Sequence, residues 1–156
     1  MAITEKARRL TLAQRPIIGL SQGEPDFGTP EHICSAAIEA MKEGKTRYTT
    51  VDGISELKEA ICAKFESEND VRYQPNQISV ATGGKQILYN ALMATVNDGD
   101  EVIISAPYWV SYPDIVLLCG GVPVFVTCGQ EQGFKLTAAG LAAAITPRTR
   151  WVILNS

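Results

Sequence analysis

The sequence predicts an α/β fold in which a mainly parallel sheet is flanked by helices and preceded by an N-terminal helical segment. From residue 77 onward, short apolar runs of strand character alternate with longer stretches whose apolar residues recur at helical spacing. Before that point the chain shows only helical periodicity and clusters of turn-forming residues. Strands that alternate with helices pair in parallel, and helices then cover both faces of the sheet.

The first half of the chain is expected to hold three helices. Residues 2–14 form a charged amphipathic stretch, and a second helix begins with Thr29 as N-cap and Pro30 at the first helical position. Gly44 is expected to end that second helix. The apolar face of the third helix consists of Ile54, Leu57, Ile61 and Phe65.

The second half is expected to alternate regularly. Strands are predicted at residues 78–82, 101–105, 123–127 and 151–154. Helices are predicted after Gly83-Gly84, over 110–118, and after the N-cap Thr137.

The composition is that of an ordinary globular domain. The chain has 156 residues, of which 46% are hydrophobic and 20% are charged, and its net charge is −3. This balance indicates neither nucleic acid nor a membrane surface as a partner. No apolar run is long enough to span a bilayer, and residues 1–10 lack the apolar region of a signal peptide. We therefore expect a cytoplasmic protein.

The cysteines do not suggest a metal site. Cys34, Cys62, Cys119 and Cys128 form no C-x-x-C pair, and the single His32 cannot complete a usual zinc set. We interpret them as small core residues in a reducing compartment.

Thr82-Gly83-Gly84-Lys85 is the first stretch that suits ligand chemistry. A predicted strand runs into two glycines and then into a helix, whose free N–H groups and positive dipole end favour a phosphate. The spacing matches neither the Walker loop nor G-x-G-x-x-G. Taken alone, the two glycines are more typical of simple turn chemistry.

Two further strand ends carry polar or aromatic groups. Tyr108 and Trp109 follow the second predicted strand and either stack on a flat heterocycle or pack over the end of the sheet. Asn155 follows the last strand and either binds in the same crevice or caps a turn. In the early loop, Glu24 and Asp26 are more typical of turn acceptors than of catalytic acids.

Six short segments occur in an order that resembles the pyridoxal-phosphate-dependent class I aminotransferases of fold type I, most of all the bacterial aspartate aminotransferases. The segments are residues 21–27 (SQGEPDF), 46–49 (TRYT), 83–86 (GGKQ), 107–113 (PYWVSYP), 144–147 (AITP) and 153–156 (ILNS). The resemblance covers nearly the whole chain. It implies part of the fold type I large domain, residues 46–156, preceded by a segment associated with the small domain, residues 1–45.

The resemblance also implies roles for individual residues. Gly83, Gly84 and Lys85 match the turn whose N–H groups hold the phosphate of pyridoxal 5'-phosphate. Trp109 matches the aromatic residue that stacks on the pyridine ring and lies near the substrate.

Two matching residues lie earlier in the chain. Gly23 matches the glycine beside the substrate α-carboxylate. Tyr48 matches a tyrosine that reaches the cofactor phosphate of the neighbouring subunit, which implies a homodimer with shared sites.

The implied reaction transfers an amino group from an L-amino acid, foremost aspartate, to a 2-oxo acid such as 2-oxoglutarate. We expect no catalytic residue in this chain, because the lysine that forms the Schiff base in this family would lie beyond Ser156. By the same resemblance, residues 78–82 lack their sheet neighbours here, and we expect the chain alone to be poorly stable and inactive.

Several alternatives stay open. An aminotransferase of the same class with another substrate (an aromatic amino acid, alanine, or glutamate with prephenate) and a related amino acid lyase share these segments. A non-catalytic remnant that binds phosphate or the cofactor would keep Gly83-Gly84 and Trp109. A nucleotide-binding domain would need an acidic residue after the second strand, where Ser105-Ala106-Pro107 stands.

Overall fold

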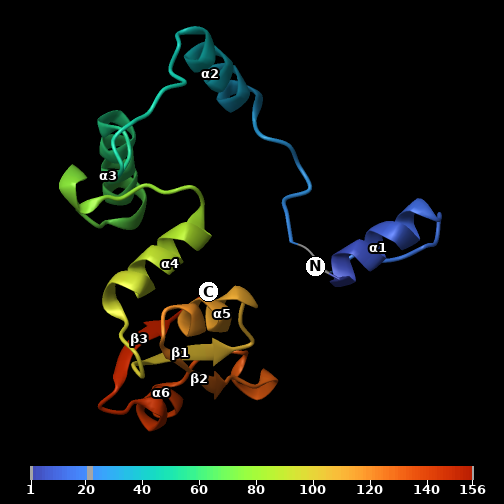
Figure 1. Ribbon diagram of the computed structural model, residues 1–156, viewed down its shortest axis with the longest axis vertical. Helices are drawn as coiled ribbons and strands as arrows, with labels where there is room; N and C mark the ends of the chain where they lie inside the picture. The colour runs from blue at the N-terminus through green and yellow to red at the C-terminus, as the bar shows by residue number, and fades with distance from the viewer. Residues whose placement is uncertain (1, 21–22, 156) are drawn as a thin grey trace. The chain divides into compact units, whose positions relative to one another are not determined.

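The computed structural model describes residues 2–20 and 23–155 (Figure 1). The chain divides into two compact units, residues 1–48 and 49–156, and each is described by itself. The assignment of residues 1–45 to a small domain and of 46–156 to a large domain stays a prediction.

Two helices form in the described residues of the first unit, 2–20 and 23–48. Helix α1 spans Ala2–Leu12, slightly less than the predicted 2–14, because Gln14 adopts a left-handed conformation with φ 53°. Helix α2 spans Glu31–Lys42. Gly44 follows the C-cap Glu43 and stops the helix as predicted, because its φ of 77° is left-handed and therefore suits glycine.

The predicted start of α2 was wrong by one residue. Pro30, not Thr29, is the N-cap, since its ψ of 141° is extended and the helix begins at Glu31. The Pro30 carbonyl accepts the Cys34 N–H at 3.1 Å, while the Thr29 carbonyl accepts the Cys34 thiol at 3.6 Å. A proline has no N–H to leave unsatisfied, so it serves in the cap position without loss.

The second unit begins with helices. Helix α3 spans Ser55–Asn69, a 3₁₀ turn spans Pro75–Gln77, and helix α4 spans Gly84–Thr95. Ile54, which was predicted on the apolar face of the third helix, is instead the N-cap of α3, whereas α4 starts directly after Gly83 as expected.

The predicted strand over residues 78–82 is not formed. The backbone is extended at Ile78, and the Val80 N–H donates to the carbonyl of Asp52 at 3.0 Å. A strand needs a neighbouring strand for its backbone groups, and none of the strands in the described part of the chain pairs with this segment. The prediction of a regular strand was therefore wrong. Among the described residues, the segment 78–82 therefore has no neighbouring strand, as expected.

The other three predicted strands form one parallel sheet. Strand β1 spans Glu101–Ala106, β2 spans Val122–Thr127 and β3 spans Thr149–Ile153. Their order is β2-β1-β3, so β1 lies in the middle. The parallel α/β fold predicted from the sequence is confirmed.

Helices lie on both sides of this sheet. Helix α5 spans Ser111–Leu118 and α6 spans Ala138–Ala144, and Figure 1 shows them on opposite sides of the strands. Thr137 caps α6, as predicted, by accepting the Gly140 N–H at 3.1 Å. The core cluster consists of Leu92, Val96, Val102, Ile104, Ile115, Val116, Cys119 and Ile153. It joins α4, α5, β1 and β3 around one face of the sheet.

A buried carboxylate fixes the start of the sheet. Glu101, only 4% exposed, accepts the Thr146 hydroxyl at 2.6 Å and the Arg148 Nε at 2.9 Å. These hydrogen bonds lower the pKa of Glu101, with the Thr146 bond as the largest cause. The network holds the segment before β3 against the first residue of β1.

The cysteines are free thiols in two environments. Cys119 and Cys128 are buried, as expected of small core residues, and Cys62 is half-buried. Cys34 is exposed on α2, so its interpretation as a core residue was wrong for the described unit. None of the helices in the described residues is long and apolar enough to cross a membrane.

Candidate active site

The turn before α4 has the geometry of an anion cradle. Gly83 has φ 84° and ψ 157°, a conformation that is essentially restricted to glycine. A Cβ built at Gly83 or Gly84 meets no heavy atom within 4 Å, so the backbone of both residues faces open space. The glycine at position 83 is therefore required by conformation rather than by crowding.

Two N–H groups at this helix start are available to a ligand. Within the described part of the chain, no acceptor takes the N–H of Gly84 or Lys85. The Gln86 N–H donates weakly, at 3.2 Å, to the Gly83 carbonyl. Free N–H groups at the positive end of a twelve-residue helix favour a negatively charged group.

The side chain of Gln86 closes the turn in a way that the sequence interpretation missed. Its Oε1 accepts the Thr82 N–H at 2.8 Å, which ties the residue before the glycines to the first turn of α4. Glutamine at the third position of a helix is a known capping signal, so the sequence did contain the pattern that could have revealed it.

The end of β1 places one aromatic ring beside this cradle. The Lys85 Nζ lies 4.8 Å from the centroid of the Trp109 indole, a cation–π contact. Trp109 remains 40% exposed. The structure thus brings Lys85, the residue directly after the two glycines, into contact with Trp109, although the two residues are 24 positions apart in the sequence.

The two aromatics after β1 have different roles. Tyr108 stacks on Phe125 of β2, with centroids 5.1 Å apart and an interplanar angle of 18°. It therefore packs over the sheet, which was one of the two interpretations of the pair. Trp109 makes an edge contact with Tyr112 at 5.5 Å and keeps part of its surface open.

Asn155 lies at the same edge of the sheet. It follows β3, whose Ile153 pairs in parallel with Ile104 of β1. The carboxyl ends of neighbouring parallel strands meet at one edge, and this is where α/β sheets bind ligands. Asn155 is exposed and ends the described part of the chain, and Ser156 lies outside the described residues.

The residues predicted in the first unit are exposed. Tyr48 is fully exposed and lines, with Thr46 and Arg47, an open pocket of about 630 Å³. Gly23 has no heavy atom near a built Cβ. Of the SQGEPDF segment, Ser21 and Gln22 lie outside the described residues. The roles expected for Gly23 and Tyr48 stay predictions.

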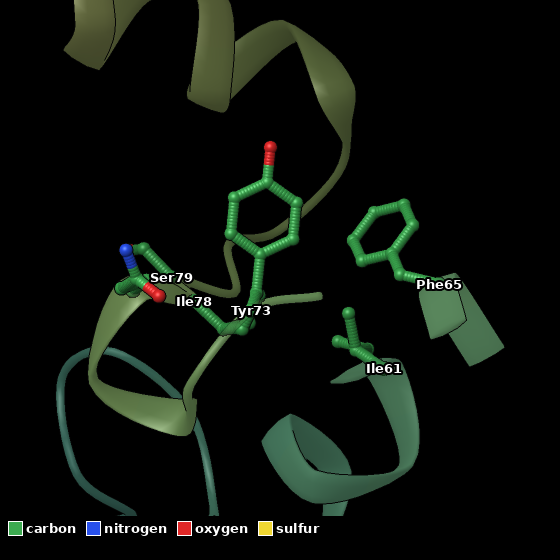
Figure 2. A pocket seen from close by; sticks show the side chains of 6 residues that line it. Ile61, Phe65, Tyr73, Ile78 and Ser79 are labelled. Carbon is green, nitrogen blue, oxygen red and sulfur yellow. The ribbon is translucent and has the colours of Figure 1, made fainter. Parts of the chain in front are cut away.

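The Thr49–Ser156 unit has a pocket of its own that is lined by none of the predicted site residues. Figure 2 shows the rings of Phe65 and Tyr73 side by side, and they make an edge contact with centroids 5.7 Å apart. The pocket measures about 390 Å³ and is lined by Ile61, Phe65, Tyr73, Gln77, Ile78 and Ser79. Among the residues that the structure describes, no charged side chain lines it and none of its lining residues belongs to the cradle.

Comparison with known proteins identifies the family. The model of the family described as aminotransferase class I and II matches residues 15–156. The chain belongs to this aminotransferase family. The α/β fold inferred from the sequence agrees with this family assignment.

Similar proteins carry related names. The chain is 65% identical over all of its 156 residues to an aspartate/prephenate aminotransferase of Cereibacter sphaeroides, of which it covers 39%. It superimposes on the crystal structure of the aspartate aminotransferase of Rhizobium meliloti with a TM-score of 0.93 and 54% identity, covering 99% of this chain and 39% of that one. For the Thermus thermophilus aspartate aminotransferase with maleate, the TM-score is 0.95, the identity 44% and the shares 99% and 41%.

The chain therefore spans about two fifths of the length of these aminotransferases. Enzymes of this class generally depend on pyridoxal phosphate and act on amino acids and 2-oxo acids, typically as dimers. The resemblance stated from the sequence is confirmed at the level of the family.

Proposed function

We propose that the natural-length protein is a pyridoxal-phosphate-dependent aminotransferase that transfers the amino group of L-aspartate to a 2-oxo acid such as 2-oxoglutarate. One observation carries the proposal: in a chain of this family, Lys85 holds its ammonium over the half-exposed Trp109 ring, while within the described residues no acceptor takes its own N–H or that of Gly84 at the start of α4. An anion cradle next to an aromatic surface suits a cofactor that is both a phosphate and a flat ring.

The residues present fit that cofactor. The Gly84 and Lys85 N–H groups would donate to the phosphate, and Gly83 lets the phosphate approach the backbone closely. The Lys85 ammonium adds a positive charge, and Trp109 would orient the pyridine ring by stacking. When bound, pyridoxal phosphate supplies an electron sink for the bonds at the substrate α-carbon.

The remaining parts of the site rest on the family. Gly23 would leave room for the substrate α-carboxylate, and Tyr48 would reach the phosphate of a partner subunit in a homodimer. The lysine that moves the proton in this family has no counterpart among the seven lysines of the chain, and Lys85 is assigned to the cradle instead.

An acidic substrate is supported by the relatives. The Thermus thermophilus enzyme is described with maleate, a dicarboxylate, and three close relatives are named for both aspartate and prephenate. Prephenate, which also carries two carboxylates, is therefore the second acceptor that we propose.

Spectroscopy on the natural-length protein tests the proposal. After addition of pyridoxal phosphate, aspartate and glutamate should each shift the cofactor absorption, whereas alanine and phenylalanine should do so weakly. Oxaloacetate and the amino acid formed from the acceptor should appear in equal amounts. Binding without any shift would favour the non-catalytic remnant, and release of ammonia or a cleaved product would favour a lyase.

A further inference from the structure

Tyr112 connects the core of the second unit to the ring of Trp109. Its partly buried side chain packs against the core cluster, which is anchored by Ile104, Ile115 and Val116. Its ring also meets the Trp109 indole at 85°, with centroids 5.5 Å apart. The same side chain therefore touches both the fixed interior and the half-exposed aromatic residue of the candidate site.

The local backbone keeps these two rings together. The Tyr112 N–H donates to the Trp109 carbonyl at 3.0 Å, so the two residues flank the first turn of α5. Side chains three positions apart on such a turn lie on the same face. The edge-to-face geometry is a preferred arrangement of aromatic pairs because the positive edge of one ring meets the negative face of the other.

Other groups constrain the Trp109 indole weakly. In the described residues, no acceptor takes its ring N–H, whereas the ring N–H of Trp151 donates to Thr95 at 2.8 Å. Lys85, the other group on the Trp109 ring, has a flexible side chain. Tyr108 is stacked on Phe125 instead.

We infer that Tyr112 is a positioning residue that sets the plane of the Trp109 indole, on which the flat ring of the cofactor stacks. The inference rests on the proposed function. It predicts that loss of the Tyr112 ring weakens binding of the pyridine ring and leaves the binding of phosphate unchanged.

A double-mutant cycle on the natural-length protein tests this. Affinities for pyridoxal phosphate and for pyridoxal, which lacks the phosphate, are measured in the native protein and in Tyr112→Leu, Trp109→Leu and the double variant. Tyr112→Leu should weaken both ligands by a similar factor, roughly three- to tenfold for an aromatic pair of this kind. In the Trp109→Leu background the same change should have no further effect.

Two controls separate positioning from general damage. Tyr112→Phe keeps the ring and should bind both ligands as the native protein does. The inhibition constant of inorganic phosphate, measured by competition with pyridoxal phosphate, should be the same in native and Tyr112→Leu protein. Thermal unfolding of each variant identifies any that fails to fold, in which case Tyr112→Met replaces Tyr112→Leu in the cycle.

The outcomes are distinct. If the effect of Tyr112→Leu persists in the Trp109→Leu background, or if Tyr112→Phe loses as much affinity, the inference is overturned while the proposed function stands. If the native protein binds no pyridoxal phosphate, the proposed function is overturned and the inference with it.

Discussion

At the scale of single residues, the candidate site depends on a few exact contacts around Lys85. Its backbone N–H belongs to the cradle and its ammonium lies over Trp109. The sequence predicted the backbone role from the two preceding glycines. It did not predict the side-chain contact, because nothing in a sequence states that positions 85 and 109 meet in space.

The charge of Lys85 should strengthen binding of the cofactor phosphate. An exposed ionic interaction contributes about 1 kcal/mol or less, so Lys85→Met should weaken pyridoxal phosphate roughly two- to fivefold. Titrations at low and high salt measure this, and the salt dependence should become smaller in the variant. Lys135→Met, at an exposed position outside the cradle, is the matched control and should leave the affinity unchanged.

The two glycines of the cradle should respond differently to alanine. Gly83 has φ 84° and ψ 157°, so Gly83→Ala should lower the free energy of unfolding by about 1–3 kcal/mol. Gly84 has no positive φ and open space around it, and alanine favours a helix, so Gly84→Ala should not destabilise. Denaturant unfolding of both variants checks this, and equal losses would contradict the conformational explanation.

At the scale of elements, helix α4 is held in place at its start by one side chain. Removal of the Gln86 acceptor leaves the Thr82 N–H unbonded, which should cost about 1 kcal/mol of stability. Gln86→Met should therefore destabilise the protein and weaken pyridoxal phosphate more than pyridoxal, because the phosphate turn is loosened. Gln86→Glu keeps the acceptor and should retain the stability. A similar loss in both variants would show that the Thr82 bond is unimportant.

Local sequence signals predicted most elements of the second unit correctly. Thr137 and Gly83 act through their immediate neighbours, so their positions alone fix where α6 and α4 begin. The segment 78–82 has equally good strand character, yet no strand forms there. A strand depends on partners that are distant along the chain, and residue patterns do not supply them.

The start of α2 shows the same limit on a smaller scale. Thr29 and Pro30 are both good start residues, and the choice between them depended on a single dihedral angle of Pro30. Cap residues predict that a helix begins, but they leave its first residue uncertain by one position.

At the scale of the whole molecule, acid should weaken the link between β1 and β3. Hydrogen bonds from Thr146 and Arg148 lower the pKa of Glu101 below its ordinary value of 4.5. The unfolded state then binds a proton more readily than the folded state. This contribution is therefore present above about pH 4.5 and is lost as the pH falls through the lowered pKa of the folded state.

Unfolding measured from pH 3 to pH 7 checks this effect. Glu101→Gln should be less stable than the native protein at pH 7, and the difference should shrink as the pH falls below 4.5. Glu59→Gln, at an exposed position in the middle of α3, is the matched control and should follow the native curve. A difference that stays constant over the whole range would contradict the linkage.

The two edges of the sheet differ in chemistry. Strand β2 contains Pro123, which has no N–H to donate, so β2 suits a permanent edge. Strand β3 contains no proline and reads TRWVI, a sequence that suits pairing on both sides. Leu154, directly after β3, is 69% exposed. These features favour the addition of further strands beside β3 rather than beside β2.

The chain expressed by itself should therefore be poorly stable. Besides the open edge of β3, it exposes large apolar side chains that include Ile18, Leu20, Tyr48, Val51 and Leu118. Open strand edges and apolar surface promote association, so the isolated chain should unfold without a sharp transition and aggregate. The natural-length protein should instead unfold cooperatively, and its intact mass should exceed twice the 16.9 kDa of this chain. Cooperative unfolding of the 156-residue chain with a stability of about 5 kcal/mol would mean that the three strands of its described part form a complete sheet.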